Sequence, residues 1–537
     1  LSFAYERFGL TTPDSSFGYD RTTHSAIDPS TIPTPVVGGT DGLEESGAVR
    51  YFMTVEGYNG GSLVSGALGA FELGSIEVSA GLGTTISTGD ITTSEPSFSE
   101  FVVTLQGMSP ELMAELVASD RLGAVHIQGI DPNGDTVYDV RLEDVAFSGE
   151  NYSTGGGTPS ASMSLNYLRI GIITPDDSFG YDVEHHTAID ANSMSVAVPS
   201  ATSGLETEPA VDYFLIIDSS VTGETGKSYI SIELSSIQFG AGIGIALNQR
   251  SDPSFSDVTV TFDGVAPNLL AFLASGNQVG PVRLAGVNSS GDIVYDILLE
   301  GAHVTSENLG ANTGFSSSVS FDFSSIGLIT TPSSFGYDVD NLVSIDPTSL
   351  TAPPDPVTSL IPSGAVQFFM MIDGLDGGTD TDTGKGWFEI SSVELGASEQ
   401  SVGADFSEVS VTLNGVSPTL FGDLATGTDF SSVMIQAVDG KGAVVYEMRL
   451  SDVLVSGTST SGTAGAVVSS ISFAYDQIGL ITPNGDVGYD TSSQELVDPL
   501  AIATPTSDGG IDIGPGNVEQ FYLLVDGFNG GSQDAGF

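Results

Sequence analysis

The chain lacks cysteine and contains very few basic residues. Without cysteine, its 537 residues can form neither disulfides nor thiolate metal sites. There are 12 Lys and Arg residues against 69 Asp and Glu residues, a formal net charge of −57. This charge disfavours nucleic acid and anionic lipid as partners, because both bind through basic patches. Two interpretations of the acidity stay open: solvation of a secreted or salt-exposed surface, or assembly that needs salt or divalent cations to screen repulsion.

Long apolar runs and recurring catalytic patterns are also missing. No stretch of about 18 uninterrupted apolar residues occurs, so the sequence predicts no transmembrane helix. There is no phosphate-binding loop and no dinucleotide-binding fingerprint. The five histidines do not recur in register, and no spacing places a Ser-His-Asp triad. We therefore predict that the protein is not an enzyme and has no catalytic or cofactor-binding residues.

What the chain does have is self-similarity over long distances. An apolar segment ending in an acidic residue occurs at 49–56, 211–218, 366–373 and 518–526, and a Ser-rich closing segment at 1–5, 162–167, 318–323 and 470–475. The period is roughly 150–160 residues, the size of a small domain. Because both ends carry only part of a unit, we expect the chain to be a window on a longer polypeptide. The predicted boundaries are partial units at 1–10 and 518–537, complete units at 49–174, 211–330 and 366–482, and linkers at 11–48, 175–210, 331–365 and 483–517.

Each complete unit is predicted to be β-rich with one helix. Segments such as Val258–Phe262 alternate apolar and polar residues, as half-buried strands do, and Asn-Gly, Ser-Gly or Asp-Gly pairs indicate hairpins. A Ser-Pro or Ala-Pro pair opens a short helix at 109–118, 266–274 and 417–425. Ser109 and Ser417 are expected to cap the first amides. Leucines four residues apart give the helix an apolar face, which is expected to plug one end of a barrel.

The linkers resemble one another in sequence more than flexible linkers would need to. Each carries a Gly-Tyr-Asp segment, then an Ile-Asp or Val-Asp pair. We predict that the linkers are extended but docked, partly as strands added to a neighbouring barrel edge. The Tyr-Asp pairs are interpreted as interdomain hydrogen-bonding groups, with sugar or cation contact as the alternative. The predicted anchors are Phe17, Tyr19, Asp20, Phe179, Tyr181, Asp182, Phe335, Tyr337, Asp338, Tyr489 and Asp490.

One loop is a candidate calcium site. Asp376, Asp380 and Asp382 lie in a Gly- and Thr-rich stretch, and alternating carboxylates of this kind suit Ca²⁺. The loop lacks the terminal bidentate Glu of an EF-hand. A solvated hairpin loop is the competing interpretation.

The order of motifs in each unit resembles the Hcp family, the tube proteins of type VI secretion systems. The opening strand ends in Asp373-Gly374, a Ser-Phe-Ser-Asp/Glu segment precedes the central strand at 97–100 and 254–257, the Ser-Pro-x-Leu helix and the hairpin follow, and Ser470–Phe473 closes the unit. The resemblance implies a small β-barrel with one helix that assembles into rings, usually hexameric, which stack into tubes. The expected fold class is therefore mainly β, with tandem Hcp-like barrels joined by long extended linkers.

The chain departs from the family by its tandem fusion, its linkers and its acidity. Covalent linkage suits a permanent filament better than discrete rings that are expelled. The leading hypothesis is a structural protein that polymerises with itself into an extracellular tube or filament. The alternatives are a type VI-like tube or effector carrier and a beads-on-a-string surface adhesin.

Overall fold

A computed structural model gives the fold of most of the chain, in two compact units. Unit 1 comprises Leu1–Tyr152, Pro159–Thr207 and Ala241–Ser254, and unit 2 comprises Ser153–Thr158, Glu208–Gly240 and Phe255–Phe537. The structure describes residues 5–11, 16–33, 47–87, 90–118, 121–155, 159–200, 205–206, 210–218, 229–246, 249–312, 314–355, 365–378, 386–400, 403–463, 466–483 and 485–506.

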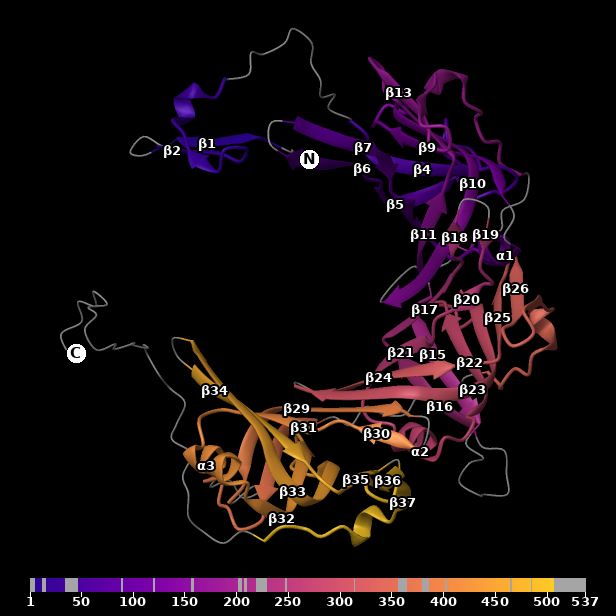
Figure 1. The fold of residues 1–537 in the computed structure, drawn as a ribbon. Coiled ribbons are helices and arrows are strands. Elements are labelled where there is room, and N and C mark those ends of the chain that lie inside the picture. The colour runs from indigo at the N-terminus through magenta and orange to yellow at the C-terminus, as the bar shows by residue number, and fades with distance from the viewer. Residues whose placement is uncertain are drawn as a thin grey trace. The chain divides into compact units, whose positions relative to one another are not determined.

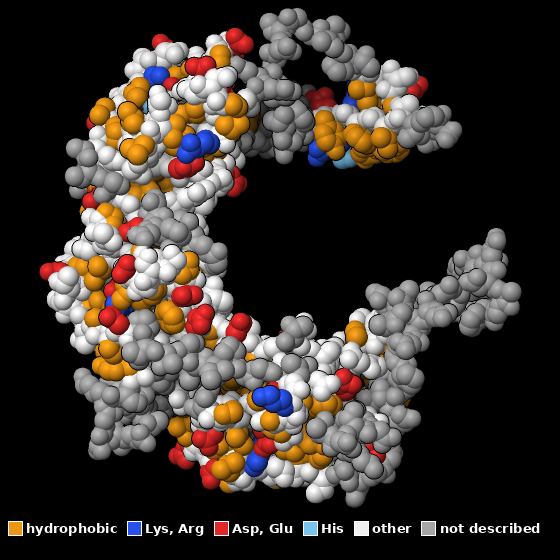
Figure 2. Space-filling view, turned by 180° about the vertical axis from the view of Figure 1, so that it is seen from behind, with side chains coloured by type: hydrophobic (Ala, Val, Ile, Leu, Met, Phe, Trp, Pro, Cys, Tyr) orange, Lys and Arg blue, Asp and Glu red, His pale blue; other side chains and the backbone are white. Residues whose placement is uncertain are grey.

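Strands dominate the described residues, which confirms the predicted mainly-β fold class. Only three α-helices occur among these residues, one in each repeat (Figure 1). On the face shown in Figure 2, acidic side chains are spread over the described residues with few basic side chains among them. None of the helices in the described part of the chain has the length and hydrophobicity needed to cross a bilayer.

The repeat at 366–482, called repeat 3, is a closed barrel. Antiparallel pairing runs from β28 to β29, β31, β34, β33 and β32 and returns to β28. Alternate side chains such as Val409, Val411 and Leu413 point into the barrel and are fully buried. The strands are β28 (Ala365–Ile372), β29 (Phe388–Glu399), β30 (Ala404–Phe406), β31 (Val409–Leu413), β32 (Asp429–Asp439), β33 (Val444–Thr463) and β34 (Ala466–Ala474).

Repeat 2, at 211–330, has the same strand order. Pairing runs from β15 to β16 and β17, which correspond to the two halves of β29, and then through β21, β24, β23 and β22 back to β15. Its strands are β15 (Asp212–Asp218), β16 (Tyr229–Leu234), β17 (Ser236–Gly242), β18 (Ile245–Ala246), β19 (Gln249–Arg250), β20 (Ser254–Phe255), β21 (Val258–Asp263), β22 (Gly280–Val287), β23 (Ile293–Ala311) and β24 (Phe315–Asp322).

Repeat 1, at 49–174, repeats these pairings in unit 1. Strand β4 pairs with β5 and β9, β5 pairs with β8, β8 with β11, and β9 with β10. A β-hairpin, β6–β7, follows β5. The strands are β4 (Arg50–Val55), β5 (Phe71–Glu77), β6 (Ala80–Ser87), β7 (Asp90–Phe98), β8 (Phe101–Gln106), β9 (Leu122–Ile130), β10 (Thr136–Gly155) and β11 (Ser160–Asn166).

The first half of each linker forms β-strands and a 3₁₀ turn. The last strand of a repeat pairs with the Gly-Tyr-Asp strand, which pairs with a two- or three-residue strand, and a 3₁₀ turn follows. We call this unit the linker module. Its first strand pairs with the long strand of the preceding repeat, β10, β23 or β33, so the added strands lie on the linker's own barrel. The modules are β1 (Arg7–Thr11), β2 (Ser16–Asp20), β3 (Ser25–Ala26) and η1 (Pro29–Thr31); β12 (Arg169–Ile173), β13 (Ser178–Asp182), β14 (Thr187–Ala188) and η2 (Ala191–Ser193); β25 (Ser325–Thr330), β26 (Ser334–Asp338), β27 (Val343–Ser344) and η4 (Pro347–Ser349); and β35 (Gln477–Thr482), β36 (Gly485–Asp490), β37 (Glu495–Val497) and η5 (Pro499–Ala501).

The helices begin where the Pro motif predicts: α1 (Pro110–Ala118), α2 (Pro267–Ser275) and α3 (Pro418–Thr426). The Ser417 hydroxyl accepts from the Leu420 amide, as expected of a cap. The matching expectation for Ser109 is wrong, because its buried Oγ has no hydrogen-bond partner among the described residues. Helix α2 lies against β23 of its own repeat and also against β36 and β37 of the linker module that follows repeat 3, so it does more than plug a barrel end.

The glycine of the Gly-Tyr-Asp strand is predicted to be essential for the linker module. A Cβ on Gly336 would lie 2.7 Å from the Ile345 carbonyl oxygen and 2.9 Å from the Pro347 nitrogen, both backbone atoms. We expect Gly336→Ala to lower the free energy of unfolding by roughly 1–3 kcal/mol, measured by chemical denaturation. Gly314→Ala is the matched control, since no atom lies within 4 Å of its Cβ position. Equal stability of the two variants would contradict this account.

Candidate functional site

The aromatic anchors of the linkers pack on the Phe of the Ser-Phe-Ser segment. In repeat 2, the Phe255 ring lies 6.5 Å from Phe335 and 5.4 Å from Tyr337. Repeat 1 has the same cluster, formed by Phe98, Phe179 and Tyr181. The motif thus fastens the linker module to the barrel that precedes it.

The corresponding cluster of repeat 3 has one aromatic residue fewer and contains additional hydrogen bonds. Phe406 lies 4.8 Å from Tyr489, and Val487 stands where the other modules have Phe. The Tyr489 hydroxyl accepts from the Ala404 amide at 3.1 Å and donates to the Ala404 carbonyl at 3.2 Å. In the N-terminal module, by contrast, Phe17 is exposed and Tyr19 is half-buried.

The aspartate anchors hold the turn inside each module. Asp338 accepts from the backbone amide and the side-chain amide of Asn341, both at 2.9 Å, and these bonds hold the pKa of its carboxyl below the usual value. The interdomain hydrogen bonds expected of these residues are local ones here. The corresponding turn bonds run to Asp20 from Thr22 and Thr23, to Asp182 from His185, and to Asp490 from Ser492 and Ser493.

An arginine of the barrel binds carbonyl groups within the 3₁₀ turn and just after it. The Arg449 guanidinium donates to Leu500 O at 3.1 Å and Ile502 O at 3.3 Å, and Glu447 holds its Nε at 2.6 Å. In repeat 1, Arg141 donates in the same way to Asn192 O and Met194 O. We call this contact the arginine clamp.

In repeat 2 the clamp comes from the neighbouring strand. Arg283 on β22 donates to Pro353 O at 3.0 Å and forms two hydrogen bonds with Asp296. It lies opposite Leu298, the position that corresponds to Arg449, and Met434 lies opposite Arg449. In repeat 2 the arginine therefore lies on β22 rather than on the long strand, but it still binds the linker backbone. Sequence patterns do not predict the arginine clamp, because its acceptors are backbone carbonyl groups, which every residue has.

The predicted calcium loop is only partly described. Asp376 accepts from the Gly378 amide at 2.9 Å, which closes a turn. Asp380 and Asp382 lie outside the described residues. Within the described ranges, no three His, Asp or Glu side chains lie together as a metal site.

Repeats 2 and 3 are joined inside unit 2 by backbone pairing. The second half of β23 pairs antiparallel with β29, from Ser306 opposite Ser398 to Ala311 opposite Val393. The two strands run side by side in Figure 1. Phe315 packs across the junction at 4.3 Å from the Tyr446 ring and 5.2 Å from the Phe368 ring. This junction is the candidate functional site, because it fixes one repeat on the next.

The junction buries a carboxyl group. Glu307 is 4% exposed and lies between Val319 and Ala397, and its Oε2 has no hydrogen-bond partner among the described residues. Burial raises the pKa of Glu307 to about 8. In repeat 1 the corresponding Glu150 is also buried, and burial, partly offset by the Tyr152 hydroxyl, raises its pKa to about 8. The sequence presents these residues as polar loop-like runs, so their burial was not predicted.

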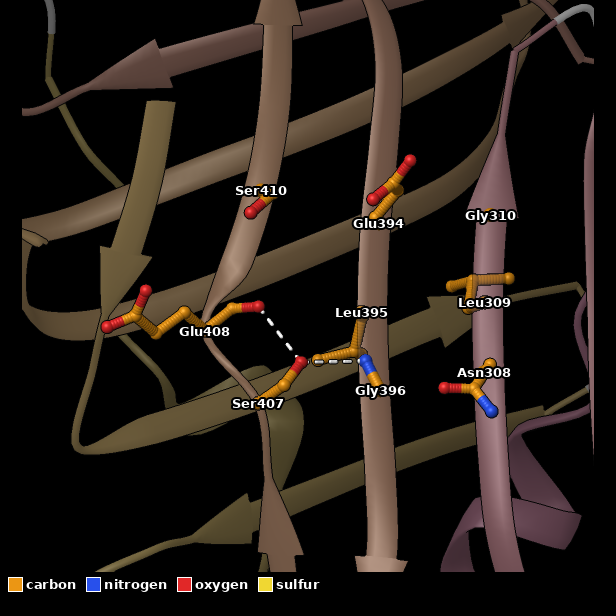
Figure 3. A pocket seen from close by; sticks show the side chains of 9 residues that line it. All are labelled: Asn308, Leu309, Gly310, Glu394, Leu395, Gly396, Ser407, Glu408 and Ser410. Atoms are coloured by element: carbon orange, nitrogen blue, oxygen red, sulfur yellow. Dashed lines mark hydrogen bonds between the residues drawn. The ribbon is translucent and has the colours of Figure 1, made fainter. Parts of the chain in front are cut away.

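A shallow groove of about 710 Å³ lies on the exposed face of the junction, over β23, β29 and β31. Figure 3 shows Asn308, Glu394 and Glu408 around it. Ser407 accepts from the Gly396 amide at 2.8 Å and donates to the Glu408 carbonyl at 3.0 Å, so its hydroxyl is engaged with the backbone.

Comparison with known proteins connects the fold to a family. Solved structures similar to parts of the chain include Hcp1 from Salmonella typhimurium (19% identity, 25% of this chain and 99% of that one, TM-score 0.24), a type VI secretion system effector from Yersinia pestis (16%, 23% and 99%, 0.21) and the secreted protein Hcp3 from Pseudomonas aeruginosa (16%, 23% and 97%, 0.21). No curated protein matches the sequence. The family model described as "Type VI secretion system effector, Hcp" matches residues 369–480. Repeat 3 is an Hcp domain. The match covers the barrel from β28 to β35, and the Hcp resemblance expected from the motifs is confirmed for this repeat.

The arginine clamp around this Hcp domain and its neighbour gives a rescue prediction. Arg283→Met removes the clamp and leaves Asp296 without its cation, so we expect a loss of about 3 kcal/mol in the free energy of unfolding. Adding Leu298→Arg recreates the pair found in repeat 3, Met434 opposite Arg449, and should restore most of the loss. Urea denaturation measures both variants, and limited proteolysis of the linker reports whether it is held. If the double variant is no more stable than Arg283→Met, the idea that an arginine at either position can hold the linker is refuted.

Burial of Glu307 predicts a pH dependence. A raised folded-state pKa means that the junction is most stable below the ordinary pKa of 4.5 and weakens as the pH rises through about 8. The free energy of unfolding should fall over this range, with an upper limit on the order of 4 kcal/mol. Glu307→Gln should remove this part of the dependence. Chemical denaturation at pH 5 and pH 8 compares the two proteins, and identical pH profiles would contradict the assignment.

Proposed function

We propose that the chain is a structural protein whose tandem Hcp-like barrels self-assemble into an extracellular tube or filament. The observation that carries this proposal is the junction in unit 2. There, two successive repeats share a continuous antiparallel ladder from Ser306 opposite Ser398 to Ala311 opposite Val393. Repeats joined by backbone hydrogen bonds keep a fixed spacing, as a filament requires.

The folded linker module supports the same proposal. A beads-on-a-string adhesin needs connectors that let its domains move. In repeats 2 and 3 the connector instead begins as two strands of the barrel sheet, and an arginine holds its continuation. Among the described residues, these contacts hold the connector against its own barrel.

A type VI-like tube or effector carrier is the second candidate. The family model that matches residues 369–480 carries that description. The two candidates differ in permanence, because a carrier must disassemble to deliver its cargo, whereas covalently joined barrels favour a lasting structure.

Electron microscopy of the full chain tests the proposal. We expect hollow or solid filaments with a regular repeat at physiological ionic strength, and shorter or fewer ones at low salt, since a net charge of −57 is then poorly screened. Isolated barrels without regular spacing under all salt conditions would overturn it. Discrete rings that release a bound protein would favour the carrier instead.

A further inference from the structure

Each linker continues past the linker module as a segment that buries every third residue. In repeat 1 the buried residues are Ala191, Met194 and Ala197, and the residues between them are exposed. The matching buried sets are Pro347, Leu350 and Pro353 after repeat 2, and Pro499, Ile502 and Pro505 after repeat 3. A period of three is that of polyproline II, and Met194 (φ −72°, ψ 150°) and Leu350 (φ −73°, ψ 149°) have its dihedral angles. Each linker therefore contains a polyproline II segment with one buried face.

In repeat 1 the linker is also held beyond this segment. The Gly57 amide donates to the Val198 carbonyl at 3.0 Å, so the linker meets the loop that follows β4. Farther along, Glu206 and Met108 exchange two backbone hydrogen bonds just before helix α1. The described parts of the linker thus contact their own barrel from β12 onward. We call residues 168–206 the strap of repeat 1.

The corresponding strap of repeat 3 reaches the same loop. The Gly374 amide donates to the Thr506 carbonyl at 3.2 Å, and the Asp373 carboxylate accepts from the amide and the hydroxyl of Thr506, both at 3.1 Å. Gly374 and Gly57 occupy matching positions after the opening strand. Two straps of different sequence follow one path, so the barrel face and its loop define that path.

The contacts that hold a strap differ from those that close a barrel. Strand β28 pairs along both edges, with β29 and with β32, so many hydrogen bonds must break together for the barrel to open. A polyproline II segment has no hydrogen bonds of its own. In repeat 3 it is attached by bonds spaced along it, from Arg449 and at Thr506. A pull on the far end loads these bonds in turn, so a strap should come away at a lower force than a barrel opens.

We propose that each strap is a length reserve. A load that opens a junction between repeats peels the strap from its barrel, and the strap rebinds when the load falls. The strap of repeat 1 has about 39 residues and reaches roughly 140 Å when fully extended. The barrel stays closed during release and keeps presenting the same face, and a polyproline II segment loses little conformational freedom on rebinding. This inference rests on the proposed function, because only a protein that carries load along its chain needs such a reserve.

Force spectroscopy on the full chain, held by its two ends, tests the proposal. We expect short extension steps of up to roughly 140 Å, before the steps of roughly 400 Å that opening a barrel of about 120 residues gives. The short steps should recur in repeated stretching cycles that stop below the force of the barrel steps. A chain that extends only in barrel-sized steps would overturn the proposal.

A disulfide lock identifies the strap of repeat 1 as the source of one short step. Met108 and Glu206 lie opposite each other as a hydrogen-bonded antiparallel pair, in which Cα atoms are about 5.5 Å apart and within reach of a disulfide. Met108→Cys with Glu206→Cys gives the only two cysteines in the chain. The oxidised variant should lose one short step, and the same variant under reductant is the matched control that retains it. Equal numbers of short steps in the two states would refute the assignment.

An arginine variant tests the same strap without a disulfide, and decides the matter if the cysteine variant does not fold. Arg141→Met removes the bonds to Asn192 O and Met194 O, and should lower the force of one short step without changing its length. Arg121→Met is the control, because Arg121 donates to Asp144 O within the barrel. Unchanged short steps in both variants would count against the strap as their source.

Microscopy separates this inference from the proposed function. Filaments from a chain without short steps would leave the structural function standing and remove the length reserve. Short steps in a chain that never forms filaments would remove the proposed function and, with it, the need for a reserve.

Discussion

The architecture depends on one strand being far longer than a barrel requires. Strand β23 runs from Ile293 to Ala311, about three times the usual strand length in globular proteins. Its first half pairs with β22 and with β25, the first strand of the linker module. Its second half pairs with β24 and with β29 of the following repeat. Barrel, linker and neighbour therefore share one backbone, and the direction of that strand sets the direction of all three.

The sequence could predict the elements that depend on local chemistry. The Ser-Pro and Ala-Pro starts place the three helices, and the alternation from Val258 to Phe262 identifies a strand whose inward residues are buried. The order of motifs was enough to suggest the Hcp family. The linkers were expected to add strands to a neighbouring barrel, but the motifs did not show that the Gly-Tyr-Asp segments are these strands or that they join the preceding barrel, because a five-residue segment with a central glycine has low strand propensity. Their pairing comes from a partner strand and from a close backbone approach that only glycine allows.

The candidate site was harder to predict from the sequence than the fold, because its contacts depend on backbone groups and on segments distant in the chain. The arginine clamps act on carbonyl groups, which carry no residue-specific signal, and the clamp in repeat 2 sits on a different strand from the other two. Glu307 lies in a Ser-Glu-Asn run that is typical of a solvated turn, yet the neighbouring repeat covers it. In both cases the environment is created by a segment distant in the chain, and local patterns do not contain it.

Backbone pairing also explains how so acidic a chain brings its repeats together. A junction built on ion pairs would need cations, and several of the twelve Lys and Arg residues are engaged within repeats with carboxylates and linker carbonyls. The β23–β29 ladder is held by backbone groups, which carry no net charge, and its two central pairs are Asn308 with Gly396 and Leu309 with Leu395. Burial raises the pKa of Glu307, which favours the protonated form of its carboxyl group, and that form carries no charge. Covalent connection then replaces a bimolecular encounter between like-charged barrels with an intramolecular one, at an effective concentration set by the linker. A linker that is itself folded on the barrel narrows the orientations that the next repeat can sample, so the electrostatic repulsion is opposed by pre-organisation rather than by attraction between side chains.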